Sequence, residues 1–231
     1  MRNRRPMSSR KPPKAVDQLG CGSTTLTRFP AGFELFNGAL TVSEQTELVA
    51  QILGLLDVAP LFEPRMPRTG KPFSVRLTNF GRLGWVSDKD GGYRYQATHP
   101  ATGQPWPAIP DILLQIWRRF AKFPGEPEAC LVNLYRDRAR MGSHRDADED
   151  EPEAPVVSVS LGDEAIFHVG GPQRSDPKVR TKLLSGDVCV LGGPSRFAFH
   201  GIDRILPGTS TLVPGGGRIN LTLRRVTRWK F

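Results

Sequence analysis

The chain has 231 residues, of which 38% are hydrophobic and 24% charged, and its formal net charge is +9. This composition is typical of a single globular domain with a sizeable core, and it excludes a wholly disordered chain. The most apolar segment, residues 48–62, is interrupted by Gln51 and Asp57, so we expect no membrane association.

The first 29 residues are expected to form a basic, disordered arm. Residues 1–30 carry seven Lys or Arg against one acid, Asp17, and contain few hydrophobic residues. No apolar stretch follows the arginines, which argues against a secretory signal. The composition fits a transit peptide, but the prolines at positions 6, 12 and 13 would interrupt its amphipathic helix. We therefore place the folded domain at residues 30–231.

Two helices are predicted in the first half of this domain. Thr41 and Glu44 match a capping box, and an apolar helical pattern follows it. Its members are Leu48, Val49, Ile52, Leu55 and Leu56. Pro110 marks the start of the second helix, whose apolar face has four residues. These are Leu113, Ile116, Trp117 and Phe120. The aromatic-rich stretch between the two helices is expected to be rich in turns.

Beyond Pro127, short segments rich in Val, Ile, Leu and Phe recur between Gly and Pro residues. They are residues 129–136, 156–161, 165–169, 179–184, 187–191, 196–202 and 219–226. Such spacing is typical of an antiparallel sandwich, barrel or jelly roll. The sequence therefore predicts two helices packed against a β-sandwich, within one domain.

Two histidines and an aspartate suggest a metal site. His144-Arg145-Asp146 is the single His-x-Asp of the sequence, and side chains two apart in an extended segment project to the same side. His200, in the strand expected to start at Arg196, can add a third ligand. Three such ligands leave coordination positions on the metal ion open, as in the facial triad of non-haem Fe(II) oxygenases. Alternatively, all three residues are ordinary loop and strand-end residues.

The last strand has a polar face. Between residues 218 and 224, polar and aliphatic side chains alternate, which places the polar ones together. These are Arg218, Asn220, Thr222 and Arg224. Guanidinium groups match carboxylates, so a dicarboxylate can engage both arginines. Asn133 and Tyr135, two apart in an earlier strand, can add polar contacts. The alternative, a solvated face with ion-paired arginines, leaves Asn133 and Tyr135 unexplained.

Several segments follow one another in a recognisable order. They are Asn133-Leu-Tyr135 and residues 144–149, 155–162, 186–188, 200–201 and 218–224. In this order they resemble the AlkB family of alkylation-repair dioxygenases, over roughly residues 30–226. Residues 77–85 and 105–110 are similar to the substrate lid of that family, so we place a lid at about residues 70–110. The basic arm lies outside the similarity.

The resemblance implies a fold and a cofactor set. The implied fold is a double-stranded β-helix, a cupin-like jelly roll, so the expected class is mainly β with flanking helices (α+β). The implied Fe(II) ligands are His144, Asp146 and His200. The residues implied to bind 2-oxoglutarate are Asn133, Tyr135, Arg218, Asn220 and Arg224. Molecular oxygen is the second cosubstrate.

The resemblance also implies a substrate. The reaction is oxidative demethylation of N-alkylated bases, of the 1-methyladenine and 3-methylcytosine type, in single- or double-stranded DNA, with RNA as a further candidate. Succinate and formaldehyde are released. Trp85 is expected to stack on the flipped base opposite His144, and Asp148 to contact its exocyclic amine. Tyr93 and Arg174 are further candidates for base or phosphate contacts. Without the resemblance, Trp85 could equally be a core residue and Asp148 a solvated acid.

Two features depart from the family pattern or from expectation. Arg145 stands where we expect a neutral amide, which suggests a phosphate contact or altered base selection. The acidic run of residues 146–153 continues past the expected ligand, and its outer members should face solvent, because clustered carboxylates repel nucleic acid.

Two other functions compete with this interpretation. One is a related dioxygenase that acts on a protein or a small molecule, which would differ only in the lid. The other is a non-catalytic nucleic-acid-binding module, which would show no iron-dependent turnover.

The three cysteines form no CxxC pair, which disfavours a disulfide framework and favours a reducing compartment. We therefore expect a cytoplasmic monomer.

Overall fold

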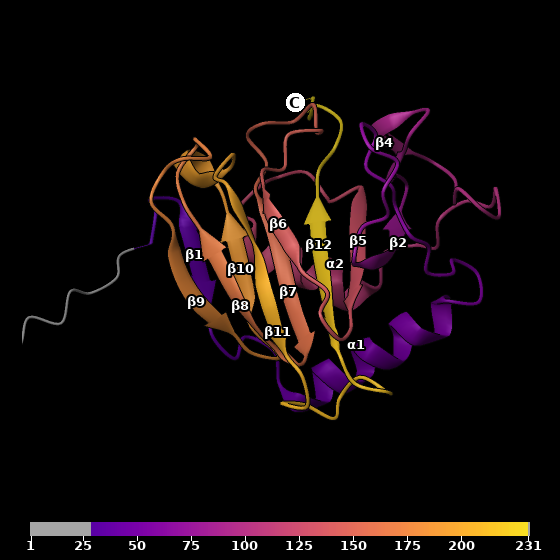
Figure 1. Cartoon of the computed structure of the whole chain (residues 1–231), viewed down its shortest axis with the longest axis horizontal. Helices are drawn as coiled ribbons and strands as arrows, with labels where there is room; N and C mark the ends of the chain where they lie inside the picture. Colours follow the sequence, from indigo (N-terminus) through magenta and orange to yellow (C-terminus); the bar gives the residue numbers. More distant parts are fainter. Residues whose placement is uncertain (1–28, 231) are drawn as a thin grey trace, which may run out of the picture.

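Within residues 29–230, which the computed structural model describes, two stacked sheets carry helices on one outer face (Figure 1). The larger sheet has the order β1-β10-β7-β12-β5-β2. Its strands are β1 (Phe33–Phe36), β10 (Val188–Leu191), β7 (Val156–Gly162), β12 (Arg218–Arg224), β5 (Ala129–Tyr135) and β2 (Arg76–Gly81). Strand β12 pairs antiparallel with both β5 and β7, which places it inside the sheet.

The smaller sheet has the order β6-β11-β8-β9. Its strands are β6 (Met141–His144), β11 (His200–Leu206), β8 (Glu164–Val169) and β9 (Val179–Leu183). Phe167 and Ile202 from this sheet join Val156 and Leu191 of the larger sheet in one apolar cluster between the layers. Two antiparallel sheets packed face to face are the jelly roll that was predicted, so the fold class is confirmed.

The two predicted helices are α1 (Val42–Leu55) and α2 (Asp111–Phe120). The capping box at α1 is present: the Glu44 backbone N–H donates to Thr41 Oγ1, and the Thr41 N–H donates to the Glu44 carboxylate. Both helices pack through their apolar faces against the larger sheet, where Leu221 and Leu223 of β12 belong to the same buried cluster. The aliphatic face of β12 therefore packs against the helices, and its polar face points into the space between the two sheets.

The stretch between the helices contains more regular structure than predicted. Residues 76–81 form the edge strand β2, which pairs with β5. The hairpin of β3 (Gly84–Asp88) and β4 (Gly92–Gln96) lies at one end of the sandwich, beside β2 and β5 (Figure 1). The strands within this turn-rich stretch were not predicted, because Leu77 and Phe80 are buried by long-range strand pairing, which the local turn residues do not reveal.

One strand boundary that matters for the site was also wrong. The segment expected to run from Arg196 to His200 is not a strand: Gly193–Ser195 forms a 3-10 turn, and β11 begins at His200 instead of placing it near its end. The Arg196 side chain is buried and donates to backbone and carboxylate oxygens, which fixes this turn. Strands β1 and β6, of four residues each, were not predicted.

Other expectations concern the ends and the cysteines. The predicted basic arm lies outside the described residues, apart from Phe29. Cys130 and Cys189 are buried free thiols, and Cys21 lies outside the described range. None of the helices in residues 29–230 combines the length and apolar character needed to cross a bilayer.

Candidate active site

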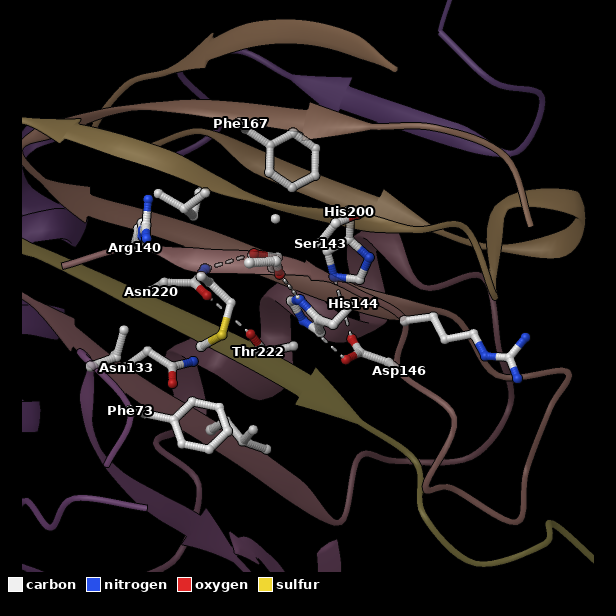
Figure 2. Close-up of a pocket in the computed structure, with 18 of the residues that line it drawn as sticks. Phe73, Asn133, Arg140, Ser143, His144, Asp146, Phe167, His200, Asn220 and Thr222 are labelled. Carbon is white, nitrogen blue, oxygen red and sulfur yellow. Dashed lines mark hydrogen bonds and ion pairs between the residues drawn. The ribbon is translucent and has the colours of Figure 1, made fainter. Parts of the chain in front are cut away.

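The two histidines and the aspartate meet at one end of the sandwich. His144 ends β6 and His200 begins β11, and the two residues are direct partners in that antiparallel pair. Asp146 follows two residues after His144. Its carboxylate oxygens lie 3.6 Å from His144 Nε2 and 3.8 Å from His200 Nε2 (Figure 2). Strand pairing therefore brings together one ligand-capable atom from each residue, all within 4.8 Å of one another.

The two imidazole rings are oriented by the backbone. His144 Nδ1 is 2.9 Å from the Gly142 carbonyl oxygen, and His200 Nδ1 is 3.0 Å from the Ala198 carbonyl oxygen. A hydrogen on each Nδ1 leaves Nε2 as the lone-pair atom. Burial, with His144 alongside, lowers the pKa of His200 to about 4, so the ring is neutral at pH 7. Two imidazole nitrogens and one carboxylate fit a divalent iron ion that keeps open coordination positions.

The Asp146 carboxylate is held by Arg224. Arg224 Nη2 lies 2.8 Å from Asp146 Oδ1, and Nη1 lies 2.9 Å from Glu149 Oε1. Burial alone would raise the pKa of Asp146, but the Arg224 guanidinium holds it well below its usual range. The buried Arg196 completes the group, because it donates to the Asp146 carbonyl oxygen and to Glu149 Oε2. The carboxylate is therefore ionised and fixed before any metal arrives.

Arg218 has a different environment from Arg224, although both lie on the same face of β12. Its residue is 1% exposed, and Nη2 donates to Ser160 Oγ at 3.0 Å. Among the described residues, Nε and Nη1 of Arg218 have no hydrogen-bond partner, and no carboxylate forms an ion pair with this guanidinium. Burial lowers its pKa. A buried cation with free donors calls for an anion, and a ligand carboxylate fits this requirement.

The other predicted polar residues surround the same space. Asn133 and Asn220 face each other across β5 and β12, and Tyr135 lies opposite Arg218 in the same register. The Asn220 amide donates to Ser158 Oγ at 2.7 Å, which fixes its orientation. Burial raises the pKa of Tyr135, so its phenol stays a protonated donor. The polar face of β12 is thus buried, and the alternative of a solvated outer face is wrong.

A cavity of about 1050 Å³ joins this polar face to the histidines and the β3–β4 hairpin. Figure 2 shows Asn133, Asn220 and Thr222 on the polar side of the cavity, with His144, Asp146 and His200 beyond them. All twelve residues that the sequence singled out as candidates line the cavity. They are Trp85, Tyr93, Asn133, Tyr135, His144, Asp146, Asp148, Arg174, His200, Arg218, Asn220 and Arg224.

The four predicted substrate residues lie at the entrance of this cavity. Trp85 Nε1 donates to Asp148 Oδ2 at 2.8 Å. The Tyr93 ring stacks on Trp85 with centroids 5.6 Å apart, and Tyr93 remains half exposed. Arg174 is exposed, and its guanidinium carbon is 5.0 Å from the centre of the Phe199 ring. An aromatic surface, a carboxylate and a cation are therefore gathered beside the histidines.

Burial within the acidic run was predicted only in part. Asp148, Asp150 and Glu153 are exposed, but Glu149 and Glu151 are buried. Glu149 pairs with two arginines, and Glu151 accepts hydrogen bonds from the Trp229 and Glu153 backbone N–H groups. The expectation that the outer carboxylates all face solvent was wrong, because distant residues supply their partners.

Three residues of this region were missed from the sequence. They are Tyr95, Glu149 and Arg196. The Tyr95 hydroxyl lies 2.5 Å from Glu149 Oε1 and accepts a hydrogen bond from Arg224 at 3.0 Å, and so joins the hairpin to the aspartate network. Tyr95 and Arg224 are 129 residues apart, so no local spacing could have paired them. Residues 148–151 are all acidic, so no local pattern distinguished the buried Glu149 from its exposed neighbours.

A jelly roll with a His-Asp-His cluster beside a buried, unpaired arginine defines the class of iron- and 2-oxoacid-dependent oxygenases. The sequence agrees: residues 32–224 match the family model of the 2OG-Fe(II) oxygenase superfamily. The chain belongs to this superfamily and, within it, to the AlkB family of alpha-ketoglutarate-dependent dioxygenases. The enzyme is therefore an Fe(II)- and 2-oxoglutarate-dependent dioxygenase that uses O2.

Individual relatives support the family assignment. The chain is 55% identical to the alpha-ketoglutarate-dependent dioxygenase AlkB homolog of Caulobacter vibrioides, over 84% of this chain and 87% of the relative. It is 35% identical to the tRNA demethylase abh1 of Schizosaccharomyces pombe, over 61% of this chain and 48% of that protein. The solved structure of OsALKBH1 matches with a TM-score of 0.70 at 30% identity, over 86% of this chain and all of the other.

Proposed function

We propose that this dioxygenase removes methyl groups from N-alkylated bases, of the 1-methyladenine and 3-methylcytosine type, in DNA, and that methylated RNA is a second substrate. The observation that carries the proposal is the cavity itself, in which Trp85, Tyr93 and Asp148 contact one another and share the lining with the histidines. The proposal that RNA is a second substrate is supported by the tRNA demethylase among the relatives. A cytoplasmic, monomeric enzyme remains our expectation.

In this proposal the metal ligands are His144, Asp146 and His200, each through the atom described above. Iron bound there, with 2-oxoglutarate and O2, supplies oxidising power that no side chain has, and the oxidised methyl carbon leaves as formaldehyde. Asp146 is kept ionised by Arg224, and both imidazole rings are oriented by carbonyl oxygens. The protein thus presents one carboxylate and two oriented imidazoles to the metal.

The cosubstrate is proposed to place one carboxylate on Arg218, whose free donors are the strongest unsatisfied feature of the cavity. The Tyr135 phenol and the amides of Asn133 and Asn220 surround the rest of the molecule. A direct contact from Arg224 to 2-oxoglutarate stays a prediction. Its Nε has no partner among the described residues, but both terminal nitrogens are taken by Asp146 and Glu149.

The substrate base must leave its stack to reach the histidines, at a cost that is lowest for a damaged or unpaired base. Trp85 offers an indole face for stacking, which is worth about 1–3 kcal/mol per base. Asp148 is positioned by the indole N–H, and its other oxygen, Oδ1, is left to accept a hydrogen bond from an exocyclic amine. A methylated adenine or cytosine has such an amine.

The experiment is incubation of the full chain with Fe(II), 2-oxoglutarate and oligonucleotides that carry one methylated base. Parallel reactions use single-stranded DNA, duplex DNA and RNA. We expect succinate and formaldehyde in equal amounts and a loss of 14 Da from the base, with no turnover by Asp146→Asn. Succinate that forms without formaldehyde or mass loss in every reaction would contradict the proposal and favour a protein or small-molecule substrate.

A further inference from the structure

His168 is a buried histidine of β8 that stands outside the metal cluster. It is 5% exposed, and it pairs across β8 and β11 with Gly201, the residue after His200. Its Nδ1 lies 2.7 Å from Asp203 Oδ1, and Arg180 Nε donates to the other Asp203 oxygen at 2.8 Å. Burial opposes ionisation of Asp203, but the hydrogen bonds from Arg180 and His168 lower its pKa. The Asp203 carboxylate therefore fixes Nδ1 as the ring nitrogen that carries the hydrogen.

The stability of the fold does not explain an imidazole at this position. The second ring nitrogen of His168, Nε2, is buried and has no hydrogen-bond partner among the described residues. A buried polar atom without a partner destabilises a fold, whereas an apolar side chain would pack here without that cost. Such departures from the ordinary rules of packing are expected at functional sites. We therefore asked which parts of the site the ring holds in place.

The ring lies against the bare backbone of Gly201. A Cβ built on Gly201 would lie 2.9 Å from His168 Cε1. It would also lie 2.5 Å from the carbonyl oxygen of Met141 and 3.0 Å from that of Gly142. One small space above β11 is thus shared by the imidazole from β8 and two carbonyl groups from β6. A glycine in a strand is typical of such a close approach between neighbouring groups.

Both histidines of the metal cluster are oriented beside this space. The Gly142 carbonyl oxygen lies 2.9 Å from His144 Nδ1 and so orients that ring. His200 is bonded to Gly201 and is the direct strand partner of His144. The register of β6 and β11 shifts between His200 and Ile202, so the strand pairing is irregular at this point. The imidazole of β8 therefore packs where the pairing of the two strands is weakest.

The ring supports the cluster from behind. Phe167 and Ile202 belong to the apolar cluster between the sheets, and side chains alternate along a strand, so His168 lies on the other face of the smaller sheet. Among the described residues, the group that could hold a metal ion includes His144 and His200 but not His168.

We propose that His168 is a positioning residue for the two histidines of the metal site. Its ring sets the separation of β6 from β11, and with it the separation of the Nε2 atoms of His144 and His200. Asp203 sets the rotation of the ring. This proposal rests on the ligand assignment in the proposed function, and it adds a support from a third strand.

The test measures the Kd and the absorption spectrum of Co(II) bound to the full chain, together with Tm. The variants are His168→Ala and Asp203→Ala. The Asp203 side chain is 29% exposed, so its replacement is the milder change and decides the matter if His168→Ala does not fold. Lys182→Gln is the matched control. Lys182 also makes an ion pair on the smaller sheet, with Glu164 at 2.9 Å, but it lies two residues along β9 from the pairing partner of His168.

For His168→Ala we expect the Kd of Co(II) to rise about tenfold, the lower end of the range for residues that orient a metal ligand. Asp203→Ala should raise this Kd about fivefold, the equivalent of one ordinary hydrogen bond. Both variants should shift the Co(II) absorption bands, which report the coordination geometry. His168→Gln, whose amide can donate to Asp203, should bind Co(II) more tightly than His168→Ala. Lys182→Gln should match the wild type in Kd and spectrum.

The positioning role is overturned if His168→Ala and Asp203→Ala keep the Kd and the spectrum of the wild type while Tm falls, because the ring would then support only the fold. It is also overturned if Lys182→Gln shows the same losses, since the effect would then be a general loosening of the sheet. Equal Co(II) binding by the wild type and His144→Ala is a distinct result, because it refutes the ligand assignment itself.

Discussion

Arg218 and Arg224 share one strand, one face and nearly complete burial, yet we predict opposite effects when each is replaced by methionine. Arg224 neutralises Asp146 and Glu149 and donates to Tyr95. Arg218 donates one hydrogen bond, to Ser160, and its guanidinium carbon lies 5.3 Å from the centre of the Tyr135 ring, with no anion among the described residues. Methionine keeps an unbranched apolar stem of similar length, so the two substitutions differ mainly in the interactions that each removed guanidinium made.

The magnitudes follow from these contacts. Arg224→Met leaves two buried carboxylates without their main counter-charge, and breaking such a pair costs about 3–5 kcal/mol. For a domain of this size, 1 kcal/mol corresponds to about 2–4 °C in Tm, so the expected loss is roughly 6–20 °C. Arg218→Met gives up one hydrogen bond worth about 1 kcal/mol and relieves the burial of a lone cation. Its stability without ligand should equal or exceed that of the wild type.

The assay is thermal unfolding, first in EDTA without ligand, and then in EDTA-free buffer with Zn(II) as an inert metal, with and without 2-oxoglutarate. Saturating ligand at 100 times Kd should stabilise the wild type by about 2.7 kcal/mol. Arg218→Met should lose this stabilisation although its unliganded Tm is unimpaired. The reasoning fails if Arg218→Met unfolds as early as Arg224→Met in EDTA. It fails equally if Arg218→Met keeps the full response to 2-oxoglutarate.

Three further predictions concern the metal cluster and its supports. His144→Ala should abolish succinate formation and weaken Co(II) binding at least tenfold in a spectroscopic titration, and wild-type binding would remove this residue from the ligand set. Tyr95→Phe removes the hydroxyl that donates to Glu149 at 2.5 Å. We expect the rate of demethylation to fall more than the rate of succinate formation. Equal losses would show that the contact between the hairpin and Glu149 supports only the fold. In Gly201→Ala the new Cβ would come within 2.5 Å of the Met141 carbonyl oxygen, so strand β6 must shift. We expect Tm to drop by several degrees. An unchanged Tm and metal affinity would contradict the close packing of β6 on β11.

The local features of the fold were readable in the sequence. The capping box at Thr41 and Glu44 and the alternation along residues 218–224 both involve neighbours in the chain, so spacing alone predicts them. The His-x-Asp pair is local for the same reason. The third histidine lies beside that pair in the structure, but the boundary predicted for its strand was wrong, because the turn that precedes it is fixed by the buried Arg196.

Only the tertiary structure separated Arg218 from Arg224. That both arginines lie on one face of the strand followed from their spacing, but their interaction partners did not. Asp146 and Glu149 lie more than 70 residues from Arg224 in the sequence, and Tyr95 lies 129 residues away. The sequence by itself therefore determined which chemistry the residues could perform, through residue types and short spacings. Which arginine is already neutralised, and which is left to receive a ligand, was decided by long-range strand pairing and by the burial that it produces.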